Sequence, residues 1–233
     1  MELREYLNTT FPRLILKPSL YHQWDIGIHF EFAKGIYQFK DNNTLNLNMF
    51  HLVYSQALSI FNYLFSEQDE IFLVTNVYNR KDNKHRINRI KVYHRFIKNK
   101  DIRFHLRHQI LPYVFNDDED ADEYYTSQFY LKCSKQDIRY SLLIKATCNE
   151  DFPLKPKLGD KNGAYYPDVF FINASKNLIL FIYDDRGCEV IANNIETIRP
   201  LYNQYNDWID KYNREEIEQR FSNGNGVIST IRS

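Results

Sequence analysis

Residues 166–192 read YPDVFFINASKNLILFIYDDRGCEVIA, and this stretch decides the fold. Two apolar runs, at 169–172 and 178–183, flank a polar segment, and a third run at 188–192 follows Asp184-Asp185-Arg186-Gly187. Short runs rich in β-branched and aromatic residues, bounded by Asn, Asp, Ser and Gly, are typical of strands joined by tight turns. The stretch therefore predicts a three-stranded antiparallel meander. Its middle strand is apolar on both faces, which indicates that both sides of the sheet are covered.

The composition is that of a globular protein with an aromatic core. The 233 residues include 18 Tyr and 17 Phe but only 7 Gly and 7 Pro, which excludes a low-complexity or disordered chain. The 30 basic and 30 acidic residues balance, so net charge favours neither polyanion binding nor an acidic tail. The start of the chain is acidic, and no apolar run reaches membrane-spanning length. We therefore expect a cytoplasmic protein without membrane association, whose Cys133, Cys148 and Cys188 are reduced and buried.

Helical spacing of apolar residues predicts four helices around the meander. They lie at 2–8, 46–65, 136–150 and 199–221. The third opens on a Ser134–Asp137 capping box. Pro200 suits the first turn of the fourth, and Asn213-x-x-Glu216 restarts it as a short helix through Phe221. Further strands are predicted at 27–32, where His29 and Glu31 share the polar face, and from Ile71. The pattern predicts a single α+β domain over residues 1–221, followed by a flexible tail at 222–233.

A basic segment between Arg80 and His108 carries eleven Lys or Arg against two acids. Within it, apolar positions from Ile90 to Phe96 alternate with Arg89, Lys91, Tyr93 and Arg95, which predicts a strand with one basic, aromatic face. Such a face is typical of proteins that bind single-stranded nucleic acid, although the outer face of a strand has the same composition.

Acidic residues and a pair of histidines give three weaker candidate sites. The run at 116–123 lacks the spacing of a Ca²⁺ loop and is interpreted as a solvated loop that can lie beside the basic segment. His105 and His108 would share a face if 102–111 is helical, but a metal site needs a third ligand. Asp185-Arg186-Gly187 is interpreted as a hairpin turn in which Gly187 takes positive φ and Arg186 pairs with an acid. The alternative is a metal site at Asp184 and Asp185, with Asp168 as a third ligand. We assign no metal ligand, cofactor or catalytic residue.

The meander also resembles a known bacterial family. Residues 167–173, 183–192 and 208–215, with landmarks at 27–32 and 69–74, resemble the domain of unknown function 3885. The resemblance implies one continuous domain in a bacterial cytosolic protein and brings no activity with it. Members often carry Arg at the position of His29, which implies that this residue is not an indispensable general base.

The expected function is a non-enzymatic protein-binding module, an immunity or antitoxin-like partner of another protein. No catalytic constellation is visible, and surface segments of strong opposite charge can steer a partner. The long connection at 151–165 is the candidate binding loop, and Asp184, Asp185 and Arg186 are candidate binding residues. The alternatives are nucleic-acid binding through Arg89, Lys91, Tyr93 and Arg95, and a metal-dependent hydrolase at Asp184-Asp185. The sequence leaves the oligomeric state open.

Overall fold

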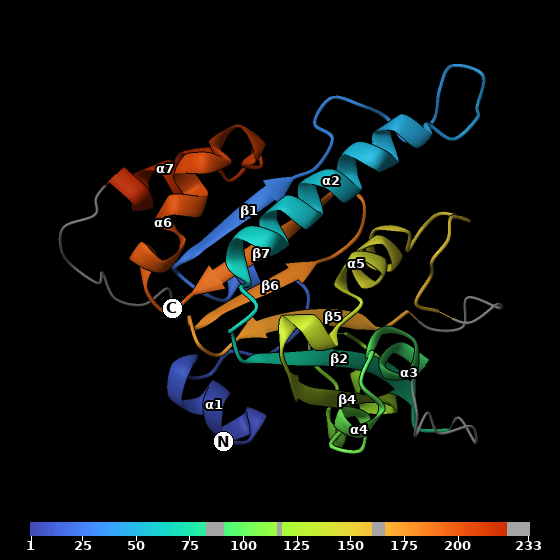
Figure 1. The fold of residues 1–233 in the computed structure, drawn as a ribbon, viewed down its shortest axis with the longest axis vertical. Helices are drawn as coiled ribbons and strands as arrows, with labels where there is room; N and C mark the ends of the chain where they lie inside the picture. Colours follow the sequence, from blue (N-terminus) through green and yellow to red (C-terminus); the bar gives the residue numbers. More distant parts are fainter. Residues whose placement is uncertain (83–90, 116–117, 160–165, 223–233) are drawn as a thin grey trace.

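One antiparallel sheet, with the strand order β1-β7-β6-β5-β2-β4-β3, forms the framework of the described chain (Figure 1). The computed structural model describes residues 1–82, 91–115, 118–159 and 166–222. The strands are β1 Gly27–Glu31, β2 Ile71–Arg80, β3 Arg107–Pro112, β4 Tyr124–Cys133, β5 Asp168–Asn173, β6 Leu178–Ile182 and β7 Gly187–Ala192. The helices are α1 Leu3–Thr10, α2 Leu47–Leu64, α3 Lys91–Phe96, α4 Lys100–Arg103, α5 Tyr140–Cys148, α6 Ile195–Gln204 and α7 Arg214–Ser222.

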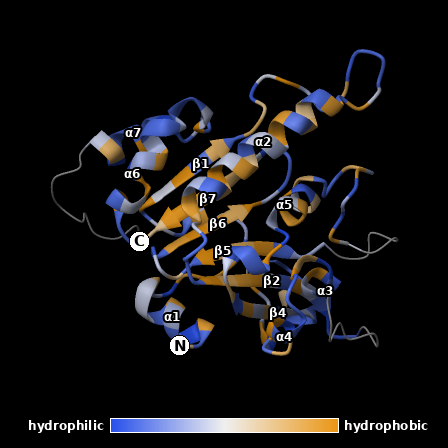
Figure 2. Cartoon of the chain, viewed as in Figure 1, coloured by the Kyte–Doolittle hydropathy of each residue, from blue (hydrophilic) through white to orange (hydrophobic). Residues whose placement is uncertain are grey.

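The predicted meander is confirmed as β5, β6 and β7, and it lies in the middle of the sheet. Both faces of its strands are buried, as the two-sided apolar pattern predicted. Figure 2 shows these strands as largely hydrophobic. Phe171 and Leu180 face the larger core beneath α2, whereas Phe170 and Phe181 face a second core that includes residues of α1. The two cores are therefore opposite faces of one sheet, and the chain folds as a single α+β domain.

The helix at 46–65 is confirmed as α2, whose N-cap side chain, Asn46, accepts a hydrogen bond from the Met49 amide. All three cysteines are free and buried, as the sequence predicted. The capping box between Ser134 and Asp137 is also present, but it caps a single 3₁₀ turn at Lys135–Asp137, and α5 begins only at Tyr140. Within the described residues, no helix is both long and apolar enough to span a membrane.

The strand predicted at 90–96 is wrong, because Lys91–Phe96 is the helix α3. The side chain that decides this is Tyr93, which is 1% exposed. Its hydroxyl lies 2.8 Å from the carbonyl oxygen of Phe129 and 3.1 Å from that of Leu73, on β4 and β2. The ring is therefore a core element and cannot stack on a base. Arg89 lies outside the described residues.

The helix at 102–111, on which the pairing of His105 and His108 depended, is not present. The segment contains the end of the short helix α4 and then the edge strand β3, which pairs with β4. His108 lies on β3 and stacks on Phe129 at a centroid distance of 4.3 Å, while His105 lies in the connection before the strand. The two histidines therefore do not share a helical face.

The C-terminal helical segment predicted at 199–221 is confirmed as two helices, α6 and α7, and the restart predicted at Asn213 is the start of α7. Asn194 caps α6, so that Pro200 lies inside this helix and not in its first turn. Chain direction changes at Ile209, which pairs with Phe30 of β1, and α7 then begins at Arg214. Ser222 is the last residue of α7, and the rest of the predicted tail lies outside the described residues.

Candidate functional site

Five carboxyl groups approach one another at one end of the sheet, which we call the acid end. β5 begins there with Asp168, and the connection from β6 to β7 contributes Asp184 and Asp185. Glu150 and Asp151 follow the C-terminus of α5, which packs on α2 and on β6. Antiparallel pairing and the docking of one helix thus bring together acids that lie as many as 35 positions apart in the sequence.

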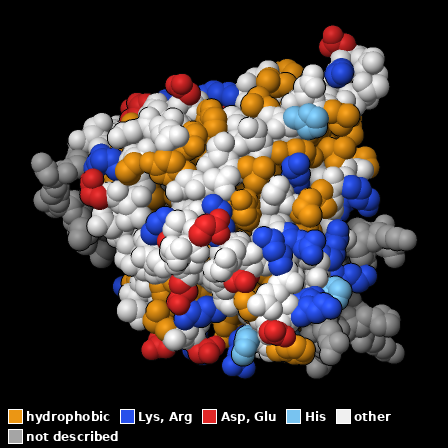
Figure 3. Space-filling view, in the orientation of Figure 1, with side chains coloured by type: hydrophobic (Ala, Val, Ile, Leu, Met, Phe, Trp, Pro, Cys, Tyr) orange, Lys and Arg blue, Asp and Glu red, His pale blue; other side chains and the backbone are white. Residues whose placement is uncertain are grey.

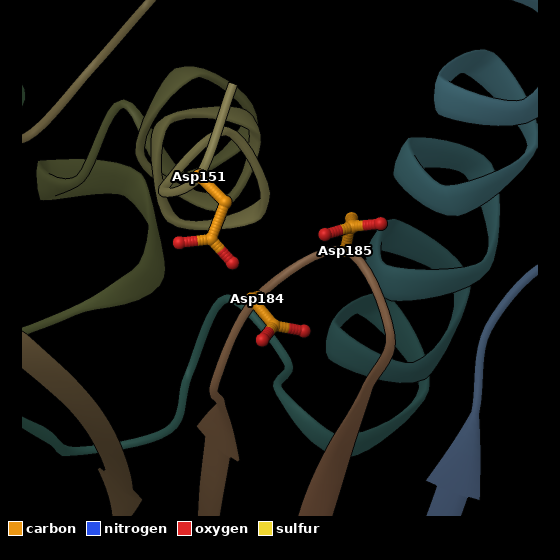
Figure 4. A group of neighbouring side chains, drawn as sticks. All are labelled: Asp151, Asp184 and Asp185. Atoms are coloured by element: carbon orange, nitrogen blue, oxygen red, sulfur yellow. The ribbon is translucent and has the colours of Figure 1, made fainter. Parts of the chain in front are cut away.

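Asp151, Asp184 and Asp185 come closest, with one carboxylate oxygen of each within 4.8 Å of the others (Figure 4). Oxygen ligands in this arrangement suit a divalent cation such as Mg²⁺ or Ca²⁺. The sequence identified Asp184 and Asp185 but expected Asp168 as the third acid. Asp151 was missed because only the position of α5 in the fold places it opposite the β6–β7 connection.

Asp168 does not belong to this trio, and its carboxylate accepts a hydrogen bond from the Tyr78 hydroxyl. Burial raises the pKa of the Asp168 carboxyl to about 6. The pKa of Glu150 rises to about 8, first because of burial and then because Asp168, Asp151 and Asp184 repel its charge. Glu150 therefore keeps its proton at neutral pH, where ordinary surface carboxyls release theirs.

The β6–β7 connection contains most of the hydrogen bonding expected for a turn. Asp184 Oδ1 accepts a hydrogen bond from the Arg186 amide at 2.7 Å, and its Oδ2 pairs with the Arg186 guanidinium. Gln38 donates to Asp185 Oδ2 at 2.9 Å, and burial raises the pKa of the Asp185 carboxyl. Both aspartates are buried, at 4% and 1% exposure, and Asp184 has an arginine as its counter-ion.

Gly187 does not adopt the positive φ that the sequence predicted, since Gly35 is the glycine with positive φ in the described chain. Gly187 instead allows its own main chain to lie close to the Phe30 carbonyl group and to the ring of Tyr183. A Cβ on Gly187 would lie 2.1 Å from the Phe30 carbonyl oxygen and 2.3 Å from the Tyr183 hydroxyl oxygen. The glycine is therefore required by contact with β1 and not by a left-handed backbone.

His29, on the edge strand β1, bonds to partners other than Glu31. Its Nδ1 lies 2.7 Å from Asn213 Oδ1, and its Nε2 lies 2.9 Å from the Tyr183 hydroxyl. The backbone of the same strand accepts a hydrogen bond from the Asp210 amide at 2.9 Å. These contacts fasten the segment before α7 to the sheet, which is a structural role.

Lys91 and Arg95, the described cations of the basic-face prediction, are both exposed on α3. Arg95 Nη1 donates to the carbonyl oxygen of Lys157 at 2.7 Å. The acidic run lies beside the start of the basic segment, because Glu123 pairs with Arg80 and the Asp122 carbonyl accepts a hydrogen bond from Lys81. It does not pair with Lys91 or Arg95 in the described residues.

We predict that the acid end behaves as a turn and not as a metal centre, because Arg186 already neutralises Asp184. Millimolar Mg²⁺ or Mn²⁺ should change the melting temperature of the native protein and that of Asp184→Asn by the same amount. A metal raises the melting temperature only when it binds the folded state in preference to the unfolded state. Differential scanning fluorimetry measures this. A metal-dependent rise that is present in the native protein and lost in Asp184→Asn would contradict the prediction and favour the hydrolase alternative.

The family model for the domain of unknown function 3885 matches residues 3–213. The chain is also similar to the uncharacterized protein YnaE of Bacillus subtilis (strain 168), with 49% identity over 212 residues. That match covers 91% of this chain and 99% of the relative. No solved structure shows significant similarity to the chain.

Proposed function

Because the chain belongs to the family of the domain of unknown function 3885, which brings no activity with it, we propose a function from its surface: a non-enzymatic protein-binding module. We place it in the bacterial cytoplasm as an immunity or antitoxin-like partner of another protein. The observation that carries the proposal is an exposed apolar loop between β1 and α2, residues 36–47, which we call the apolar loop.

The apolar loop projects from the body of the molecule (Figures 1 and 3). Four large apolar side chains within twelve residues are well exposed: Ile36 at 44%, Tyr37 at 78%, Phe39 at 53% and Leu47 at 51%. Single exposed apolar residues are ordinary, but several together mark a surface that another molecule covers. Tyr and Phe are also residue types that are enriched at protein interfaces.

Main-chain and side-chain contacts hold the loop in one conformation. Phe39 pairs with Leu45 in an isolated bridge, and the Lys40 amide donates to the Thr44 carbonyl at 2.9 Å. Phe39 also contacts Phe152 at a ring-centroid distance of 6.0 Å, and Gln38 bonds to Asp185. A pre-formed loop binds at a lower entropic cost than a flexible one, which favours a role in recognition.

The position of the loop supports the binding residues expected from the sequence. Gln38 links it to Asp185 in the β6–β7 connection, and Phe152 belongs to the segment 151–165 that the sequence singled out. Residues 160–165 of that segment lie outside the described residues. The partner surface that fits has apolar side chains to cover Tyr37 and Phe39 and a polar rim toward Arg186, which is exposed beside the buried Asp185.

Site-specific photo-cross-linking tests this proposal. A benzophenone side chain at Tyr37 should capture one stoichiometric protein in the native host, because this ring is the most exposed of the four. Phe39→Asp in the same protein should remove the product, since a buried charge without a partner opposes association. The cross-linked protein is identified by mass spectrometry, and the purified pair is then tested for suppression of the partner's toxicity or activity.

Tyr212 provides the matched control, because it is 83% exposed but belongs to the segment before α7. A benzophenone there should not capture the same protein. The proposal fails if cross-linkers at positions 36, 37, 39 and 47 yield only monomer. A cross-linked homodimer, confirmed by light scattering, would assign the apolar loop to self-association and also overturn it.

Nucleic-acid binding is the alternative function. It requires that the basic segment is uncovered, and the exposure of Lys91 and Arg95 on α3 meets this requirement. Arg139 and Lys98 are also exposed. Arg139 lies beside α3, because its amide donates to the Phe96 carbonyl at 2.7 Å. If this alternative holds, single-stranded DNA or RNA should be retarded at low salt and released steeply as salt rises. That outcome, lost in Lys91→Glu/Arg95→Glu, would favour nucleic acid over a protein partner.

A further inference from the structure

A second surface, separate from the apolar loop, lies where β3 ends and β4 begins. It is an open groove with a volume of about 310 Å³. Three tyrosines and a proline supply most of its lining, together with Lys81 and residues of the short 3₁₀ turn Ala121–Glu123. The lining tyrosines are Tyr113, Tyr124 and Tyr125, and the proline is Pro112. We call this feature the tyrosine groove.

Packing fixes the rings of the tyrosine groove. Tyr113 stacks on Tyr124 at a centroid distance of 5.1 Å and an interplanar angle of 29°. Behind them, Phe115 meets Tyr113 edge-on at 5.4 Å and Tyr78 at 5.2 Å. The rings therefore form a rigid aromatic cluster, in which each tyrosine combines an apolar face with a polar hydroxyl.

The rim of the groove is acidic. Residues 118–123 supply five acids, all exposed, while the neighbouring cations among the described residues are Arg80, Lys81 and Lys17, whose Nζ lies 5.7 Å from the centroid of the Phe115 ring. Glu123 is paired with Arg80, and Lys81 donates to the main-chain carbonyl of Asp122 at 2.6 Å and not to its carboxylate. This excess of negative charge repels phosphate groups and attracts a cationic ligand.

We infer that the tyrosine groove binds an extended, proline-containing peptide segment of a partner protein, with an Arg or Lys that pairs with the acidic rim. Proline rings pack well on aromatic faces, and a polyproline II segment is already ordered, so that little entropy is lost on binding. Such a segment also presents unpaired carbonyl groups, to which tyrosine hydroxyls can donate. The inference extends beyond the apolar loop, and either surface can be wrong without the other.

Fluorescence polarisation of a labelled synthetic peptide tests the inference. The probe contains Pro-Pro-Ala-Pro followed by Arg, and two control peptides replace its prolines by Ala or its Arg by Glu. We expect saturable binding of the probe and a loss of affinity of about tenfold or more for each control peptide, because each removes one of the two recognised features.

Variants of the protein locate the site. Tyr125→Ala should weaken binding of the probe by about tenfold. Asp122→Asn should weaken binding by a few-fold, because it removes one charge of the acidic rim. This second effect should be absent for a probe whose Arg is replaced by Ala. Tyr124→Phe keeps the stacked ring and so guards against loss of the fold; it should bind with a small deficit. Tyr212→Ala, an exposed tyrosine elsewhere, should bind as the native protein does.

Three outcomes would overturn the inference: no saturable binding, equal binding of the proline-free peptide, or equal binding by Tyr125→Ala. Saturable binding of a saccharide at the same tyrosines, without peptide binding, would also overturn it. The two surfaces are distinguished by crossing the variants. Phe39→Asp should leave peptide affinity unchanged, and Tyr125→Ala should leave the cross-link from Tyr37 unchanged.

Discussion

Gly187→Val is expected to destabilise the protein by more than about 3 kcal/mol, enough to unfold a domain of ordinary stability at elevated temperature. A side chain at this position meets the Phe30 carbonyl oxygen and the Tyr183 hydroxyl, both closer than 2.5 Å to the new Cβ. Neither can retreat easily, because Phe30 lies in β1, paired with β7, and Tyr183 is bound to His29. Urea unfolding followed by circular dichroism measures the loss.

Gly35→Ala is the matched control for this substitution. Gly35 has a φ of +74°, but no atom lies within 4 Å of its Cβ position. Alanine there should cost about 1 kcal/mol, from backbone strain alone. If Gly187→Val were no more harmful than Gly35→Ala, the close packing of the β6–β7 connection against β1 would be refuted.

Raising the pH from about 4.5 to 8 is expected to destabilise the native protein through the acid end. The pKa of Glu150 in the folded protein is about 8, compared with 4.5 for an ordinary glutamate. The folded state therefore binds this proton more tightly than the unfolded chain does, and stability falls as the pH rises through the interval between the two values. Asp168, with a pKa of about 6 against 3.8, acts in the same direction over a lower range.

Glu150→Gln should remove most of this dependence and stabilise the protein at pH 8, on the order of 2 kcal/mol, because the amide is never charged. At pH 4.5 the variant and the native protein should have similar free energies of unfolding. Glu67→Gln, at an exposed glutamate after α2, serves as the control and should change neither value by more than about 0.5 kcal/mol. A native protein that becomes more stable between pH 5 and 8 would contradict the expected sign.

The sequence by itself determined the parts of the fold that local pattern dictates. A strand buried on both faces is apolar at most of its positions, so β6 and its neighbours were visible as short apolar runs between turn residues. The apolar stripe of α2 was visible for the same reason, since its period is a local property. The pairing of Asp184 with Arg186 was also predictable, because both residues lie in one turn.

Tertiary structure alone decided the segments in which a local pattern fits two structures. Alternation at 90–96 fits a strand, but the segment folds as the helix α3. From this helix the Tyr93 hydroxyl donates to main-chain carbonyl groups on β2 and β4. The same holds for the acid end and for the tyrosine groove. The acid end depends on the docking of α5, which brings Asp151 to Asp184, and the tyrosine groove depends on strand pairing that brings Pro112 opposite Tyr125. Contacts between residues distant in sequence leave no periodic signal, because each side chain also suits an ordinary exposed position.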